Sequence, residues 1–188
     1  MALKATIFKV ALQIADMDRN YYADHGLTIA RHPSETDERM MVRILAFALN
    51  AHEKLAFGKG LSTDDEPDLW QQDLTGRIRL WIDVGQPDEK LVRRACGRAD
   101  EVIIYTYGRS AELWWARCTA LERTSNLRVV SVPMIACQDL AKLAQRTMDL
   151  QGTIQEGHVW LGNRDRTVEV ALTALTGPHA GSSSRDLL

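Results

Sequence analysis

The chain has 188 residues, of which 45% are hydrophobic and 26% charged, a composition typical of a globular protein with a sizeable core. Its net charge of -2 excludes a global basic field, so any nucleic-acid binding would need a local patch. Its three cysteines lack CxxC spacing, which argues against a disulfide framework or a structural zinc site. Neither a signal peptide nor an apolar run of about 18 residues is present, so we expect a cytoplasmic protein with no membrane partner.

The first segment is predicted to be an antiparallel hairpin. Residues 4–14 and 21–31 are rich in β-prone side chains, and residues 16–20 between them are turn-like. We therefore expect an amino-terminal β-hairpin within residues 1–31.

A helix is predicted next, with Ser34 as its N-cap and an end near Leu55. At 3.6 residues per turn, Glu38 falls in line with the apolar residues of this helix. We therefore expect the Glu38 carboxylate on the apolar side and Arg39 and Arg43 on another face. Glu35 is interpreted only as an acid that favours the amino end of the helix.

A second hairpin is predicted around a turn at Thr75-Gly76, between extended runs that begin near Pro67 and end near Gly85. A hairpin centred between residues 75 and 76 places Asp68 directly opposite Asp83. Two neighbouring carboxylates repel each other, so they normally share a cation or a proton when they are buried.

From residue 87 to residue 132 the pattern alternates between helix and strand. Helices are predicted from Pro87 to about Arg98 and over 110–121, and strands over 102–107 and 127–132. This alternation indicates parallel neighbouring strands joined by right-handed crossovers.

The carboxyl-terminal part has a different pattern. A helix is predicted over 135–146, followed by antiparallel strands over 148–155, 158–161 and 167–173. These strands are expected to form a small antiparallel β appendage. The glycine- and serine-rich residues 177–188 are predicted to be a disordered tail.

The three acidic residues Glu38, Asp68 and Asp83 would meet if the first helix packs its apolar stripe on the second hairpin. Three converging carboxylates form a hard, oxygen-rich site suited to Mg²⁺ or Mn²⁺. Such an ion can activate water, while Lys90 or Arg94 on the following helix could hold a phosphate. The reaction that such a site would serve is phosphodiester hydrolysis.

Several motifs make residues 1–174 resemble the YaeQ family. They are Met1-Ala-Leu-Lys-Ala-Thr-Ile7, Ala30-Arg-His-Pro-Ser-Glu-Thr-Asp-Glu-Arg-Met-Met41, Asp64-Asp-Glu-Pro67, Leu80-Trp-Ile-Asp-Val-Gly85, Pro87-Asp-Glu89 and Thr153-Ile-Gln-Glu-Gly157. The resemblance implies a variant of the PD-(D/E)xK nuclease fold, an α/β fold with a mixed central sheet, flanking helices and acids that bind a divalent metal. Residues 1–175 would then be one domain, with the amino-terminal hairpin at 1–31, the nuclease-like core at 34–133 and the helix with its β appendage at 135–175.

The resemblance also assigns roles to individual residues. Asp68 would be the acid of the PD element, Glu38 the first-helix glutamate and Asp83 the acid of the (D/E)xK motif. Gly85 stands where the superfamily usually has lysine. Two replacements for the lysine are open: Lys90 reaching back from the next helix, or Gln86 acting as a polar orienter.

An alternative remains open because of the glycine. A fold relative without catalysis could bind nucleic acid or a protein partner through the helix that carries Lys90, Arg93 and Arg94. The residues do not indicate an oligomeric state.

Overall fold

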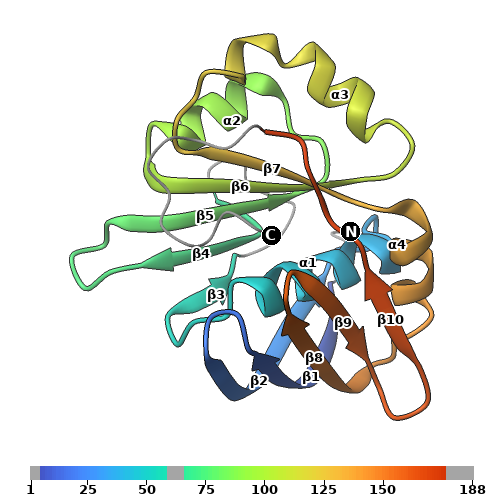
Figure 1. Ribbon diagram of the computed structural model, residues 1–188. Helices are drawn as coiled ribbons and strands as arrows, with labels where there is room; N and C mark the ends of the chain where they lie inside the picture. Colours follow the sequence, from blue (N-terminus) through green and yellow to red (C-terminus); the bar gives the residue numbers. More distant parts are fainter. Residues whose placement is uncertain (1–4, 59–65, 177–188) are drawn as a thin grey trace.

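A computed structural model describes residues 5–58 and 66–176, and within these ranges it has two mixed β-sheets and four α-helices. The layers are stacked as Figure 1 shows: α2 and α3, then sheet B, then α1 and α4, then sheet A. None of the described helices is long and apolar enough to cross a membrane.

Sheet A has the strand order β10-β9-β8-β1-β2, and sheet B has the order β11-β7-β6-β5-β4-β3. The strands are β1 Thr6–Asp16, β2 Tyr21–Arg31, β3 Leu55–Phe57, β4 Leu69–Gln72, β5 Ile78–Val84, β6 Ala99–Tyr107, β7 Leu127–Val132, β8 Thr147–Gln155, β9 His158–Gly162, β10 Thr167–Val170 and β11 Thr173–Ala174. The helices are α1 Asp37–Leu49, α2 Glu89–Cys96, α3 Ala111–Arg117 and α4 Met134–Ala141, with a short 3₁₀ turn at Thr119–Leu121.

The amino-terminal hairpin is confirmed: β1 and β2 pair antiparallel from Thr6 opposite Arg31 to Asp16 opposite Tyr21. The expected appendage is corrected. Its strands β8, β9 and β10 do pair antiparallel with one another, but β8 also pairs parallel with β1. The amino-terminal strands β1 and β2 and the carboxyl-terminal strands β8 to β10 therefore form one five-stranded sheet. Its inner face covers helix α1.

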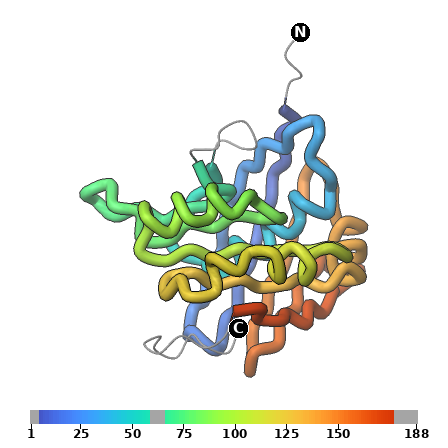
Figure 2. The backbone as a smooth tube through the Cα atoms, turned by 90° about the horizontal axis from the view of Figure 1, so that it is seen from above, coloured from blue at the N-terminus to red at the C-terminus, as the bar shows by residue number. Residues whose placement is uncertain are grey.

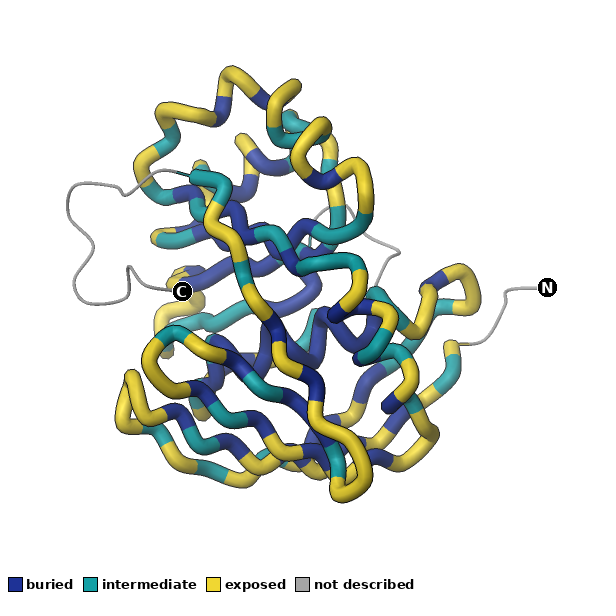
Figure 3. Tube along the Cα trace, turned by 45° about the vertical axis from the view of Figure 1, so that its right-hand side comes forward, coloured by how far each residue is buried: buried dark blue, intermediate teal, exposed yellow. Residues whose placement is uncertain are grey.

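Helix α1 is the centre of the molecule. Every residue from Met40 to Leu49 is buried, because the helix lies between sheet A and sheet B. Figure 3 shows the same distribution, with buried residues gathered between the layers and exposed residues on the turns. A helix that is covered on most of its circumference needs apolar residues on most of its faces.

Both predicted ends of α1 were wrong. The N-cap is Thr36, whose hydroxyl accepts a hydrogen bond from Arg39 N at 3.2 Å, whereas the Ser34 hydroxyl bonds to the ring of His32. The helix ends at Asn50, which has a non-helical backbone and whose side chain donates to Ala46 O at 2.8 Å. The residues up to Leu55 then start β3.

Sheet B confirms the predicted parallel order: β5 pairs parallel with β6, and β6 with β7. The crossovers carry α2 and α3, which lie over the outer face of the sheet (Figure 2). The inner face contributes Leu80, Ile82 and Val84 to the core around α1. The outer face forms a second apolar cluster that includes Trp81 and Val92.

The β4–β5 hairpin has the predicted register, with Leu69 opposite Ile82 and Trp70 opposite Trp81. A bulge between Gln71 and Gln72 shifts the pairing nearer the turn. At the turn Gly76 has a φ of 82°, a value that glycine adopts without strain. The prediction that Asp68 lies opposite Asp83 is therefore confirmed.

Smaller differences concern the ends of elements. Helix α2 begins at Glu89, not at Pro87 as predicted. Asp88 is its N-cap, and the Asp88 carboxylate accepts a hydrogen bond from Lys90 N at 2.8 Å. The strand predicted to end at residue 173 is divided: β10 stays in sheet A, while β11 pairs with β7 in sheet B. The expected tail at 177–188 and the acids Asp64 and Asp65 lie outside the described residues.

Candidate functional site

Asp68 and Asp83 meet at one end of the β4–β5 hairpin. The backbone N–H of Asp68 donates to Asp83 Oδ1 at 3.3 Å. In the other direction, Asp68 Oδ2 accepts from the backbone N–H of Val84 at 2.8 Å. These reciprocal bonds hold the two acids together, and we refer to Asp68 and Asp83 as the acid pair.

Asp83 lies on the outer face of sheet B, beside Trp81. The indole Nε1–H of Trp81 donates to Asp83 Oδ2 at 2.8 Å. Burial, and next the nearby charge of Asp68, raise the pKa of Asp83 to about 6, while the Trp81 bond, the Asp68 N–H and Arg39 oppose the rise. A carboxyl group whose pKa lies this close to neutral pH is suited to accept and release protons.

Asp68 is ion-paired to two arginines of α1. Arg39 Nη2 lies 2.8 Å from Asp68 Oδ1 and 2.7 Å from Oδ2, and Arg43 Nε lies 3.4 Å from Oδ1. Asp68 is only 8% exposed and Arg43 only 1%. The α1 arginines, predicted to face away from the site, are therefore the groups that neutralise Asp68.

Glu35 completes this network. Its carboxylate lies 2.8 Å from Arg39 Nη1 and 3.1 Å from Arg43 Nη1, and the residue is 5% exposed. The interpretation of Glu35 as a helix-end acid missed this pairing. Only part of the signal was in the sequence: Arg39 and Arg43 are four apart and so lie on the same side of α1, whereas Glu35 precedes the N-cap and is placed by the loop.

Glu38 is not placed with the acid pair. Second to burial, its charge helps to raise the pKa of the Cys137 thiol on α4 to about 12. Helix α1 does reach the acid pair, but through the neighbouring Arg39, which contacts Asp68. Across residues 5–58 and 66–176, no three His, Cys, Asp or Glu side chains are grouped to hold a metal ion.

The other predicted site residues follow β5, in the turn after it and on α2. Gln86 donates to Tyr107 O at 3.2 Å and to Ser110 Oγ at 3.0 Å, so its amide joins the ends of β5 and β6. Lys90 is exposed on α2, and within the described ranges its Nζ has no hydrogen-bond partner. Arg93 pairs with Glu89 at 2.5 Å, and Arg94 is exposed.

The glycine that stands in place of the lysine of the (D/E)xK motif has a backbone explanation. Gly85 has a φ of 115°, a conformation that L side chains rarely adopt. Its N–H donates to Tyr105 O at 2.9 Å, which fixes the turn out of β5. A lysine at this position would have space for its Cβ but would strain the backbone.

The donor chemistry of the acid pair fits a divalent cation, because carboxylate oxygens are the ligands that Mg²⁺ and Mn²⁺ prefer. The arrangement fits only in part. Both oxygens of Asp68 accept hydrogen bonds from Arg39, so the guanidinium takes the position of a counter-ion. A metal held by Asp68 and Asp83 would therefore have to displace Arg39 from Asp68.

The family model described as YaeQ protein matches residues 1–172. Over 182 residues the chain is 46% identical to the "Uncharacterized protein YaeQ" of Escherichia coli (strain K12), covering 95% of this chain and 99% of the relative. The corresponding protein of Salmonella typhi is 44% identical over 183 residues, with the same coverage.

Two crystal structures are also similar to this chain. The YaeQ protein from Xanthomonas axonopodis pv. citri has a TM-score of 0.88 and 49% identity, covering 93% of this chain and 99% of that one. The YaeQ protein from Pseudomonas syringae has a TM-score of 0.88 and 39% identity, covering 93% and 97%. The mixed α/β architecture is therefore shared with solved structures.

Proposed function

Because the chain belongs to the YaeQ family, we propose that it is a nuclease-like protein that hydrolyses phosphodiester bonds of nucleic acid at the acid pair. One observation carries the proposal: Asp68 and Asp83 are held together by reciprocal hydrogen bonds, and burial with the charge of Asp68 raises the pKa of Asp83 to about 6. Paired acids in different environments are typical of hydrolytic sites. The proposed ancestry is the PD-(D/E)xK superfamily.

The chain's own residues would divide the work as follows. Asp83 would accept the proton of the attacking water as the bond between phosphorus and the leaving oxygen breaks, and that oxygen would take a proton from solvent. Asp68 would orient that water, and Arg39, once released from Asp68, would offer its guanidinium to a phosphate oxygen. A Mg²⁺ or Mn²⁺ ion held by Asp68 and Asp83 would supply Lewis-acid stabilisation of the phosphate.

The residues after Gly85 complete the proposed surface. Lys90, Arg93 and Arg94 are exposed on α2, which covers the same face of sheet B as Asp83. We assign these three side chains to contacts with the nucleic-acid backbone. Gln86, held by Tyr107 and Ser110, would be a fixed polar group beside them. We leave Glu38 out of the proposed site, because among the described residues no third acid is grouped with the acid pair.

The test is cleavage of end-labelled DNA and RNA oligonucleotides, single- and double-stranded, with Mg²⁺ or Mn²⁺. We expect cleavage by the wild-type protein and a loss of at least about a hundredfold in Asp83→Asn, the size typical of removing a group that acts in the transition state. Asp165→Asn is the matched control, because Asp165 is exposed. Absence of cleavage by the wild-type protein, or equal cleavage by Asp83→Asn, would refute the proposal.

A second function is favoured by the arginine pairing of Asp68 and by Gly85. Both features suit a fold relative that binds nucleic acid or a protein without catalysis. In that case nucleic-acid binding would persist in EDTA and in Asp83→Asn, would weaken with salt, and would weaken further when Arg93 and Arg94 are both changed to Gln. The same purified proteins distinguish the two functions.

A further inference from the structure

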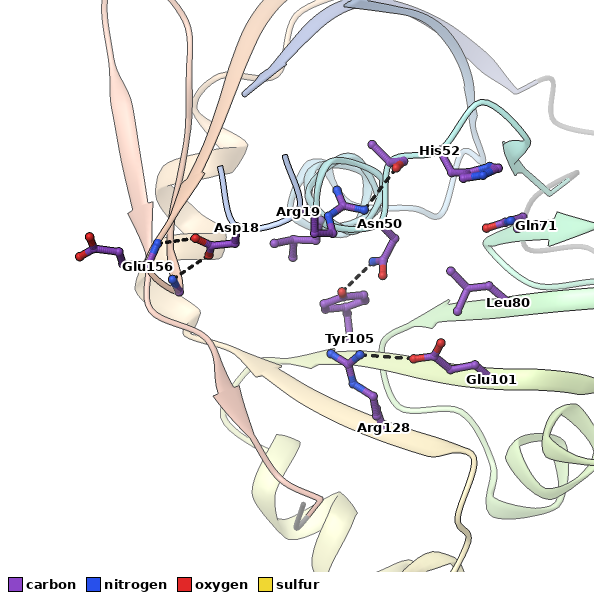
Figure 4. Close-up of a pocket in the computed structure, with 13 residues that line it drawn as sticks. Asp18, Arg19, Asn50, His52, Gln71, Leu80, Glu101, Tyr105, Arg128 and Glu156 are labelled. Carbon is purple, nitrogen blue, oxygen red and sulfur yellow. Dashed lines mark hydrogen bonds and ion pairs between the residues drawn. The ribbon is translucent and has the colours of Figure 1, made fainter. Parts of the chain in front are cut away.

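A cavity of about 500 Å³ lies where α1 ends between the two sheets. Figure 4 shows labelled side chains around it from β4, β5, β6, β7, the end of α1 and the turn after β1, whereas the labelled Glu156 points away. Its volume falls in the range of small-molecule sites. Asn50, at its centre, is eleven positions along the chain from Arg39, so this cavity and the acid pair lie toward opposite ends of α1.

Several polar groups at the cavity have unused hydrogen-bonding capacity. The Tyr105 hydroxyl, on a residue only 3% exposed, accepts from Asn50 Nδ2 at 2.8 Å, so its own hydrogen is available. Burial raises the pKa of Tyr105, which keeps the hydroxyl protonated. Within the described ranges the Gln71 amide has no hydrogen-bond partner. His52 Nδ1 accepts from Lys54 N at 3.1 Å, which leaves its Nε2–H as a donor.

Except for Glu156, which is exposed and whose side chain points away from the cavity in Figure 4, the charged groups of the lining are already matched. Asp18 accepts from the backbone N–H groups of Glu156 and Gly157 at 2.7 and 2.9 Å. Arg19 is paired with the buried Asp16 at 2.5 Å. Arg128 is paired with Glu101 at 3.3 Å. A charged ligand would have to break one of these pairs, so the lining favours an uncharged ligand.

The cavity also has an apolar side, formed by Leu49, Ala51 and Leu80. An apolar wall suits a flat ring, and the Gln71 amide offers a donor and an acceptor side by side. Such an amide pairs with the edge of a nucleobase that carries an adjacent acceptor and donor. We propose that this cavity binds an uncharged planar heterocycle of that kind, a nucleobase or nucleoside, with Gln71 and Tyr105 as its polar contacts.

The test is isothermal titration of the full chain with adenosine, guanosine, cytidine and uridine. We expect at least one nucleoside to bind with a Kd below about 1 mM. Gln71→Ala and Tyr105→Phe should each weaken that binding by roughly fivefold, the effect of losing one hydrogen bond. Gln72→Ala is the matched control, because Gln72 pairs with Ile78 of the outer cluster, whereas Gln71 pairs with Leu80 of the inner one.

Two further comparisons make the result decisive. Asp83→Asn should leave the nucleoside Kd unchanged, because the cavity does not depend on the acid pair. If Tyr105→Phe fails to fold, as judged by circular dichroism, Gln71→Ala against Gln72→Ala carries the test. The proposal is overturned if none of the four nucleosides binds, or if Gln71→Ala binds as tightly as Gln72→Ala.

Discussion

Replacing Asp83 by Asn should change how stability depends on pH. The pKa of Asp83 rises from 3.8 to about 6 on folding, so the folded protein holds this proton more tightly than the unfolded chain. The stabilisation is fully present below about pH 4 and is lost as pH rises through about 6. At about 1.4 kcal/mol for each pKa unit, the loss is about 3 kcal/mol, which we reduce to about 2 because Asp83 is partly exposed.

The measurement is the free energy of unfolding in urea at several pH values between about 4 and 8. Asparagine is neutral throughout, and Trp81 can still donate to its oxygen, so Asp83→Asn should gain about 2 kcal/mol over the wild type at about pH 8 and little at about pH 4. Asp165→Asn should follow the wild-type curve. A stability difference between Asp83→Asn and the wild type that does not vary with pH would refute this account of the Asp83 environment.

Three further predictions concern the neighbours of the acid pair. Arg39→Met leaves two largely buried carboxylates, Glu35 and Asp68, short of a partner, so it should lower the free energy of unfolding by about 3 kcal/mol. The same change should tighten Mn²⁺ binding, measured by calorimetry. Unchanged Mn²⁺ affinity would contradict the role of Arg39 as counter-ion. Gly85→Lys restores the usual motif residue but should lower the free energy of unfolding in urea by about 1–3 kcal/mol, because residue 85 has a positive φ. A stabilised Gly85→Lys protein would show that the backbone argument is mistaken. Trp81→Phe removes a hydrogen bond that lowers the pKa of Asp83, so carboxyl ¹³C NMR titration should give a pKa for Asp83 above about 6. A lower pKa would count against the role of the Trp81 hydrogen bond.

Local patterns predicted much of the fold. Two hairpins, the parallel order of β5, β6 and β7 and the register that sets Asp68 opposite Asp83 all follow from period-two alternation and turn residues. The pairing of β8 with β1 joins segments more than a hundred residues apart, and nothing local in either segment specifies the partner. The two-sheet architecture was missed for that reason.

The candidate site was predictable to the same extent. The acid pair depends on a hairpin, whose register is local, so it could be derived from the sequence. Whether Glu38 joins the acid pair depends on which face of α1 meets sheet B. That face could not be derived, because α1 is apolar on nearly every face. When almost the whole circumference of a helix is buried, its periodicity no longer indicates the direction of one side chain.

The central claim is that Asp68 and Asp83 form the reactive centre, with Arg39 as the counter-ion that a metal replaces. Anomalous diffraction from crystals soaked in Mn²⁺ tests it most directly. The account predicts an anomalous peak about 2.0–2.6 Å from oxygens of both acids, with the Arg39 guanidinium moved away from Asp68. An intact Arg39–Asp68 pair without a peak beside it at saturating Mn²⁺ would contradict the account.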